Sequence, residues 1–156
     1  LRTPNSAIRL PHPGVVQKAF WSPEGDRVVT TGWTHEQGAI TESYARVWSV
    51  PGGEPLSPFV KLPAGVMDVR FDSNRVSLLV QAHLDTKSWA SALVLDAADG
   101  KRLLPPLADK TGVFFCAFSP DGRRIVTTSF NGTARVWDAA NGHPVTPILP
   151  HPPLSP

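Results

Sequence analysis

The stretch VFFCAFSPDGRRIVTTSFNGTARVWDAANG, residues 113–142, alternates short apolar runs with strong turn signals. In the Ser-Pro-Asp-Gly sequence at 119–122, proline fixes φ for a turn, aspartate can bond its own backbone, and glycine tolerates positive φ. Asn131-Gly132 is the strongest two-residue signal for a hairpin. The run between these turns, residues 124–130, is rich in β-branched side chains. The stretch therefore predicts three antiparallel strands joined by tight turns.

A fourth, proline-containing segment follows at Val145–Leu149. Asn141-Gly142 turns the chain toward it. Pro144 and Pro147 cannot donate ladder hydrogen bonds, so this segment is expected at a sheet edge. Residues 113–149 thus predict a unit of four short antiparallel strands.

Two earlier stretches repeat this unit, the first clearly and the second in outline. The landmarks of the first are Trp21-Ser22-Pro23-Glu24-Gly25, Val28-Val29-Thr30-Thr31-Gly32 and Ala45-Arg46-Val47-Trp48; those of the second are Phe71-Asp72-Ser73-Asn74, Leu78–Ala82 and Ala92–Asp96. Trp21 to Phe71 is 50 positions and Phe71 to Phe118 is 47. This spacing is near the repeat length of β-propeller blades and far from that of short helical solenoids.

The predicted fold is all-β: three four-stranded antiparallel propeller blades that form an open arc or part of a larger ring. We place the blades at about residues 12–60, 63–106 and 109–149, with 150–156 as the start of a further repeat. The whole chain, 1–156, is then a single partial propeller domain.

These residues resemble the WD-repeat family of β-propellers. Ser-Pro-Asp-Gly at 119–122, Asn-Gly-Thr-Ala-Arg-Val-Trp-Asp at 131–138 and Gly142 carry the resemblance, which extends over about residues 8–151. It is strongest to bacterial repeats that end Val-Trp-Asp-Ala-Ala-Asn-Gly. The resemblance implies a non-catalytic protein-interaction scaffold within a larger multidomain protein. A sensory domain of a signalling protein such as a Ser/Thr kinase is an alternative by analogy.

The resemblance also implies a hydrogen-bonded set in each blade: a His before the first strand, a Ser or Thr on the second, an Asp in the next turn and the Trp of the third. Here the set is incomplete, because Leu95 stands where the middle Trp is usual and Asp109 lies near the place of the third His. The sequence therefore predicts blades held more by apolar packing than by polar contacts. The expected structural residues are His12, Thr31, Trp48, Ser129, Asn131, Trp137 and Asp138.

Composition excludes several classes of partner. The chain is 41% hydrophobic and 18% charged, and no apolar run approaches the ~20 residues that span a bilayer, so no membrane partner is expected. Its net charge of +2 is mild and its basic residues are scattered, which argues against nucleic acid. We expect a cytoplasmic location.

The metal-ligating and nucleophilic residue types form no site. Cys116 is the single cysteine and lies in an apolar run, so it is expected to be a buried core residue. Neither a metal nor a cofactor is expected, because no histidine has metal-ligand spacing. The histidines are His12, His35, His83, His143 and His151.

The two ends of the chain share a motif. Leu149-Pro150-His151-Pro152 repeats Leu10-Pro11-His12-Pro13, as if a fourth repeat starts and stops. We expect a piece of a longer propeller, because three blades leave two apolar faces uncovered. Its partners are then the remaining blades of its parent chain. The alternative is self-assembly into a closed ring.

Two insertions suggest a binding rim. Residues 34–43 lengthen the loop between the second and third strands of the first copy by 8 relative to the third copy, and residues 84–91 lengthen the matching loop of the second copy by 5. Equivalent loops lie on one side of a propeller, where aromatic side chains suit a protein or peptide partner. The alternative is that these loops are passive. The expected rim residues are Trp33, His35, Glu36, Gln37, His83, Asp85, Lys87, Trp89 and Phe130.

An enzyme is the rival class. The expected first strands carry Lys18, Asp68 and Arg70 toward the channel, but the chain shows no carboxylate pair, Ser nucleophile motif or kinase element. Asp121 and Asp138 have structural positions in or beside turns. No catalytic residue is therefore assigned.

Overall fold

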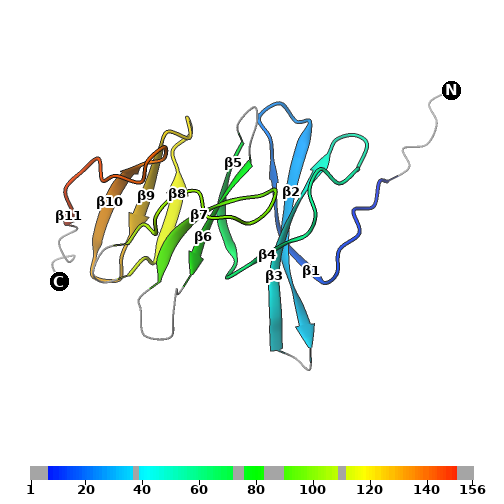
Figure 1. The fold of residues 1–156 in the computed structure, drawn as a ribbon, viewed down its shortest axis with the longest axis horizontal. Coiled ribbons are helices and arrows are strands. Elements are labelled where there is room, and N and C mark those ends of the chain that lie inside the picture. The colour runs from blue at the N-terminus through cyan, green and yellow to red at the C-terminus, as the bar shows by residue number, and fades with distance from the viewer. Residues whose placement is uncertain (1–6, 37–38, 72–75, 83–89, 109–111, 151–156) are drawn as a thin grey trace, which may run out of the picture.

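The computed structural model describes residues 7–36, 39–71, 76–82, 90–108 and 112–150, which form three antiparallel sheets side by side (Figure 1). We number the sheets blades 1 to 3. Blade 1 contains β1 (Val15–Trp21), β2 (Arg27–Glu36), β3 (Ala39–Ser49) and β4 (Val60–Leu62). Blade 2 contains β5 (Val66–Phe71), β6 (Val76–Ala82) and β7 (Ser91–Asp96), and blade 3 contains β8 (Phe115–Phe118), β9 (Arg124–Thr128), β10 (Thr133–Asp138) and β11 (Leu149–Pro150).

The fourth strands differ from the prediction. In blade 3 the edge position is confirmed, but β11 has only two residues, Leu149 and Pro150. Blade 2 has three strands in the described residues, and isolated bridges from Ala92 to Leu107 and from Leu95 to Arg102 mark the place of a fourth. Prolines interrupt both segments, and a residue without a backbone N–H cannot extend a ladder.

The Ser-Pro-Asp-Gly turn between β8 and β9 is confirmed. Gly122 has φ of 65° and donates its N–H to the Ser119 carbonyl oxygen at 2.7 Å. Asp121 accepts hydrogen bonds from the Ser119 hydroxyl at 2.6 Å and from the Arg123 N–H at 3.0 Å. The first of these bonds is the main reason that the pKa of Asp121 is lowered from its ordinary value. Asp121 therefore stabilises the turn.

Apolar layers join the blades. Val29 and Val47 of blade 1 pack with Leu78 and Leu95 of blade 2 in the first layer. Four side chains from blades 2 and 3 pack in the second layer: Leu79, Val94, Ile125 and Trp137. Successive side chains of a strand point to opposite faces, so a strand buried on both faces is apolar throughout. Leu78 and Leu79 of β6 show this, because Leu78 packs in the first layer and Leu79 in the second.

Candidate interaction surfaces

Four of the nine predicted rim residues are described, namely Trp33, His35, Glu36 and Phe130, and they lie near the ends of β2 and β9. Figure 1 shows that β2, β6 and β9 all end at the same lower side. Trp33 is half-buried there, and its ring lies 6.0 Å from the His35 ring in an edge-to-face contact. His35 and Glu36 are exposed at the end of β2. The remaining predicted rim residues of the two insertions, Gln37, His83, Asp85, Lys87 and Trp89, lie outside the described residues.

The expected loop at residues 34–43 is wrong, because β2 continues to Glu36 and β3 already begins at Ala39, so the described part of this stretch is strand. The ladder extends to the pair Glu36 and Ala39, with a register shift after Thr34. A hydrogen bond of 2.7 Å joins the hydroxyls of Thr34 and Thr41 across the strands. β-Branched residues favour an extended ladder, and such cross-strand pairs stabilise it. The insertion thus lengthens two strands.

An exposed aromatic pair lies at the rim end of blade 3. Phe130, in the turn between β9 and β10, is 68% exposed, and Phe114 beside it is 57% exposed. Their ring centroids are 4.8 Å apart in an edge-to-face arrangement. Phe114 was missed from sequence, because it lies inside the apolar run 113–118 that reads as one buried strand. The strand begins only at Phe115, which leaves Phe114 outside it.

The hydrogen-bonded set of blade 1 uses Thr30 instead of the predicted Thr31. The Trp48 indole N–H donates to Thr30 Oγ1 at 2.7 Å, and His12 Nε2 lies 2.7 Å from the same oxygen. Thr31 Oγ1 is buried without a hydrogen-bond partner in the described residues. Neighbouring residues of a strand point to opposite faces, and Trp48 lies on the Thr30 face. A polar set therefore supplements the apolar packing of blade 1.

Blade 3 differs from the prediction in the same way. The Trp137 indole N–H donates to Thr127 Oγ1 at 2.9 Å, not to the predicted Ser129. Trp137 is paired in register with Ile125, and Thr127, two residues further along β9, lies on the same face. Ser129 comes after the end of β9 and uses its backbone N–H to donate to the Thr133 carbonyl at 2.9 Å.

Asn131 and Asp138 hold turns. Asn131 Oδ1 accepts hydrogen bonds from the Thr133 N–H at 3.2 Å and from the Thr133 hydroxyl at 2.7 Å. Asp138 Oδ1 accepts from the N–H groups of Ala140 at 2.8 Å and Asn141 at 3.2 Å. Both side chains satisfy backbone donors where the chain reverses.

The three charged residues expected in the channel link blades instead of converging. Lys18 Nζ donates to the Val66 carbonyl of blade 2 at 3.2 Å. Asp68 Oδ2 accepts from the Phe118 N–H of blade 3 at 2.8 Å. Arg70 lies against the Gly122 turn, where a Cβ would come within 2.7 Å of its Nε. Each one joins its blade to the next.

The described residues lack two kinds of feature. The ranges from 7 to 150, with their gaps, contain no group of three His, Cys, Asp or Glu that could hold a metal ion. They also contain no helix long and apolar enough to cross a membrane.

Cys116 is fully buried, and burial, with a smaller contribution from the Asp68 charge, raises the pKa of its thiol from 9.0 to about 12. At pH 8 the thiolate fraction is then about a thousandfold below that of an unfolded thiol. We expect iodoacetamide to alkylate the native chain about a thousandfold more slowly than the chain in denaturant. Native and denatured rates within tenfold of each other would contradict this burial.

The same shift gives a pH dependence of stability. Between pH 9 and about 12 the unfolded thiol has lost its proton while the folded thiol keeps it. Because the unfolded state then binds fewer protons, the free energy of unfolding falls as pH rises, by at most about 1.4 kcal/mol per pH unit from this group. A Cys116→Ser variant is the control: its denaturation midpoint should change less over this range.

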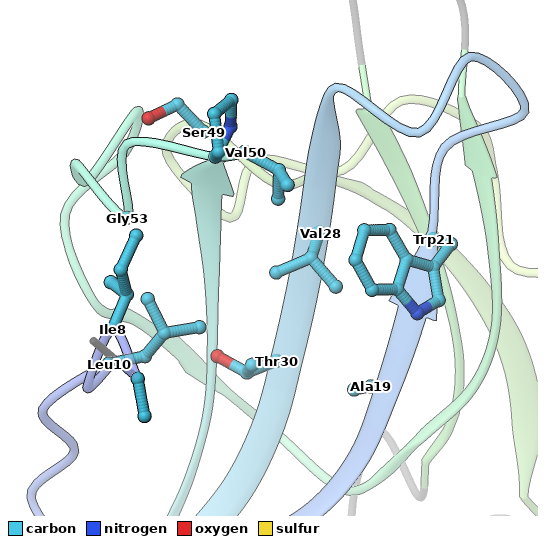
Figure 2. Close-up of a pocket in the computed structure, with 11 residues that line it drawn as sticks. Ile8, Leu10, Ala19, Trp21, Val28, Thr30, Ser49, Val50 and Gly53 are labelled. Atoms are coloured by element: carbon cyan, nitrogen blue, oxygen red, sulfur yellow. The ribbon is translucent and has the colours of Figure 1, made fainter. Parts of the chain in front are cut away.

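A hollow of about 470 Å³ opens on the face of blade 1 that points away from blade 2. Figure 2 shows Trp21 and Val28 on one side of it and Ile8 and Leu10 of the N-terminal segment on the other. Trp21 is 63% exposed. The hollow is mostly apolar, and sequence reasoning located it only as an uncovered end of the arc.

Comparison with known proteins agrees with this geometry. Residues 105–138 match the family model described as WD domain, G-beta repeat. The crystal structure of the computationally designed Ika4 protein has a similar fold, with a TM-score of 0.57 and 18% identity over 90% of this chain and 78% of that chain. A search of curated proteins gave no match.

The three sheets are therefore β-propeller blades. The match in blade 3, together with the fold, supports the WD-repeat family for this chain. WD repeats generally mediate protein–protein interaction and are generally non-catalytic.

Proposed function

We propose that this chain is a non-catalytic protein-interaction module whose binding surface is the rim at the ends of β2 and β9. The observation that carries the proposal is the exposed pair Phe114 and Phe130. Aromatic side chains supply large, rigid contact areas and dominate affinity at protein interfaces. Trp33 and His35 extend the aromatic character of the same side at blade 1. The module binds a protein or peptide.

The wider context of the module is proposed from the resemblance alone. All three blades are WD repeats of the bacterial type, and the module belongs to a larger multidomain protein in the cytoplasm. A sensory role beside a signalling domain such as a Ser/Thr kinase is the analogous setting. An enzyme is not favoured, because Lys18, Asp68 and Arg70 each contact a neighbouring blade.

The rim proposal is tested by capture of partners from a lysate of the source organism. A Phe114→Ala, Phe130→Ala double variant is expected to lose at least about tenfold of the protein captured by the wild type, since each aromatic anchor at an interface contributes about 1 kcal/mol or more. Both side chains are more than half exposed, so the fold should be retained.

The matched control is Leu56→Ala, which truncates a side chain that is 54% exposed and lies outside the rim. It should capture the same proteins as the wild type. Equal capture by the wild type and the double variant, with unchanged circular dichroism, would count against the rim.

A further inference from the structure

The surface that blade 1 presents to blade 2 occurs again on blade 3. Val29, Ala45 and Val47 of blade 1 are 0%, 0% and 5% exposed in the layer against blade 2. The residues at the same places in blade 3 are Val126, Ala134 and Val136. The register is also the same, because Val29 pairs with Val47 as Val126 pairs with Val136.

These three residues of blade 3 are only partly buried. They alternate along β9 and β10 with Ile125 and Trp137, which point toward blade 2. Val126, Ala134 and Val136 therefore point the other way. Blade 3 thus presents, on its outer face, the same Val-Ala-Val surface that blade 1 uses to bind blade 2.

The complementary face lies at blade 1. In blade 3 this face carries Ile125 and Trp137, and it is covered by Leu79 and Val94 from the strands of blade 2. The equivalent residues of blade 1 are Val28 and Trp48. Beside Val28 lies the hollow of about 470 Å³ (Figure 2).

Part of this face of blade 1 is already covered, because Trp48 is 1% and Val28 is 6% exposed, whereas Trp21 is 63% exposed and forms its open part. A Cβ on Gly53 would lie 3.4 Å from Leu10 Cδ2, just as a Cβ on Gly142 would lie 3.3 Å from Leu107 Cδ2. Residues 7–10 thus occupy on blade 1 the place that Leu107 and its neighbours occupy on blade 3. The hollow lies between this segment and strands β1 and β2, which contribute Trp21 and Val28 to its lining.

A cation and an aromatic ring complete the match. The Arg27 guanidinium of blade 1 lies 5.7 Å from the centroid of the Phe71 ring of blade 2. The residue equivalent to Arg27 in blade 3 is Arg124, which is exposed, and the residue equivalent to Phe71 in blade 1 is Trp21, which is 63% exposed. A cation over a Trp face is a favourable contact.

We propose that two copies of this chain associate head to tail, with blade 3 of one copy in the hollow on blade 1 of the other. Val126, Ala134 and Val136 fill the hollow, and Arg124 lies over Trp21. The second copy is the occupant that fits, because its own chain supplies both complementary faces.

One of two segments must move away in this contact. Residues 7–10 of one copy and β11 of the other copy would otherwise occupy the same fourth-strand position beside β10. β11 is the segment that yields, since it has two residues and both are exposed. Residues 7–10 of the second copy then lie along β10. The Leu-Pro sequence at 149–150 is repeated at 10–11, so the replacement is chemically alike. This association is independent of the rim.

The test is the solution mass of the full chain, measured by size-exclusion chromatography with light scattering over a concentration series. The wild type is expected to form a discrete multiple of the monomer. Trp21→Asp alters the hollow and Val136→Asp alters the opposite face, so each variant alone is expected to be monomeric. Leu56→Asp, outside both faces, is the control that should keep the wild-type mass.

Mixing the two monomeric variants is the decisive step. The Trp21→Asp copy keeps its blade 3 face and the Val136→Asp copy keeps its hollow, so an equimolar mixture is expected to give a 1:1 dimer. Arg124→Glu, an exposed substitution on the blade 3 face, replaces Val136→Asp if circular dichroism shows that the latter fails to fold.

Two results would overturn the proposal. A monomeric wild type at all concentrations would show that copies do not associate, and would favour further blades of the same polypeptide as the cover of both faces. A mixture that stays monomeric would show that the two faces do not bind each other.

Discussion

Replacing Leu79 by alanine is expected to lower the free energy of unfolding by about 2–5 kcal/mol. Leu79 is 0% exposed in the centre of β6, where it packs with Ile125 and Trp137 in the layer between blades 2 and 3. Truncation removes buried apolar area and leaves a cavity that the strands can fill only in part. Urea denaturation followed by tryptophan fluorescence measures the change.

Leu56→Ala is the matched control for this substitution. The Leu56 side chain is 54% exposed, so its loss should change the free energy of unfolding by no more than about 0.5 kcal/mol. If Leu79→Ala were as mild as this control, blades 2 and 3 would not be packed through the described layer.

The second large effect is expected from Thr30→Val, which should lower the free energy of unfolding by about 1–3 kcal/mol. The substitution keeps the shape of the side chain but removes the oxygen that accepts the Trp48 indole N–H and contacts His12 Nε2. Trp48 is 1% exposed, so its N–H cannot turn to water instead. A buried donor without an acceptor costs its full desolvation free energy.

The neighbouring residue supplies the control. Thr31 is 2% exposed, and its hydroxyl has no hydrogen-bond partner among the described residues. Thr31→Val is therefore expected to leave stability unchanged or raise it by up to about 1 kcal/mol. The opposite order, with Thr31→Val the more harmful variant, would support the original sequence assignment.

These two threonines show which part of the polar contact is predictable from sequence. The presence of a Ser or Thr contact to the strand-three Trp was predictable in blades 1 and 3, but the residue was wrong both times. The choice between Thr30 and Thr31 depends on which face of β2 lies toward Trp48, and a shift of one residue in register reverses every face. Sequence spacing alone does not fix that register to one residue.

The candidate rim was predicted in part. Its side of the molecule followed from the repeat, because equivalent loops lie together, and Phe130, one of the predicted rim residues, is exposed. Phe114 was not found, since an apolar run gives no sign of where its strand begins. The β2–β3 extension was also missed, because a ladder and a loop of the same length differ only in cross-strand pairing.

The all-β class, the approximate places of the strands and the turn at 119–122 were predictable from the amino-acid sequence alone. These features depend on turn chemistry and β-branched side chains, which act over a few neighbouring residues. The contacts across strands and blades, such as Thr30 with Trp48 and Asp68 with the Phe118 N–H, became visible only in the folded arrangement. Such contacts join residues from 18 to 50 positions apart. Register and sheet packing select them, and both depend on the arrangement of the whole set of blades.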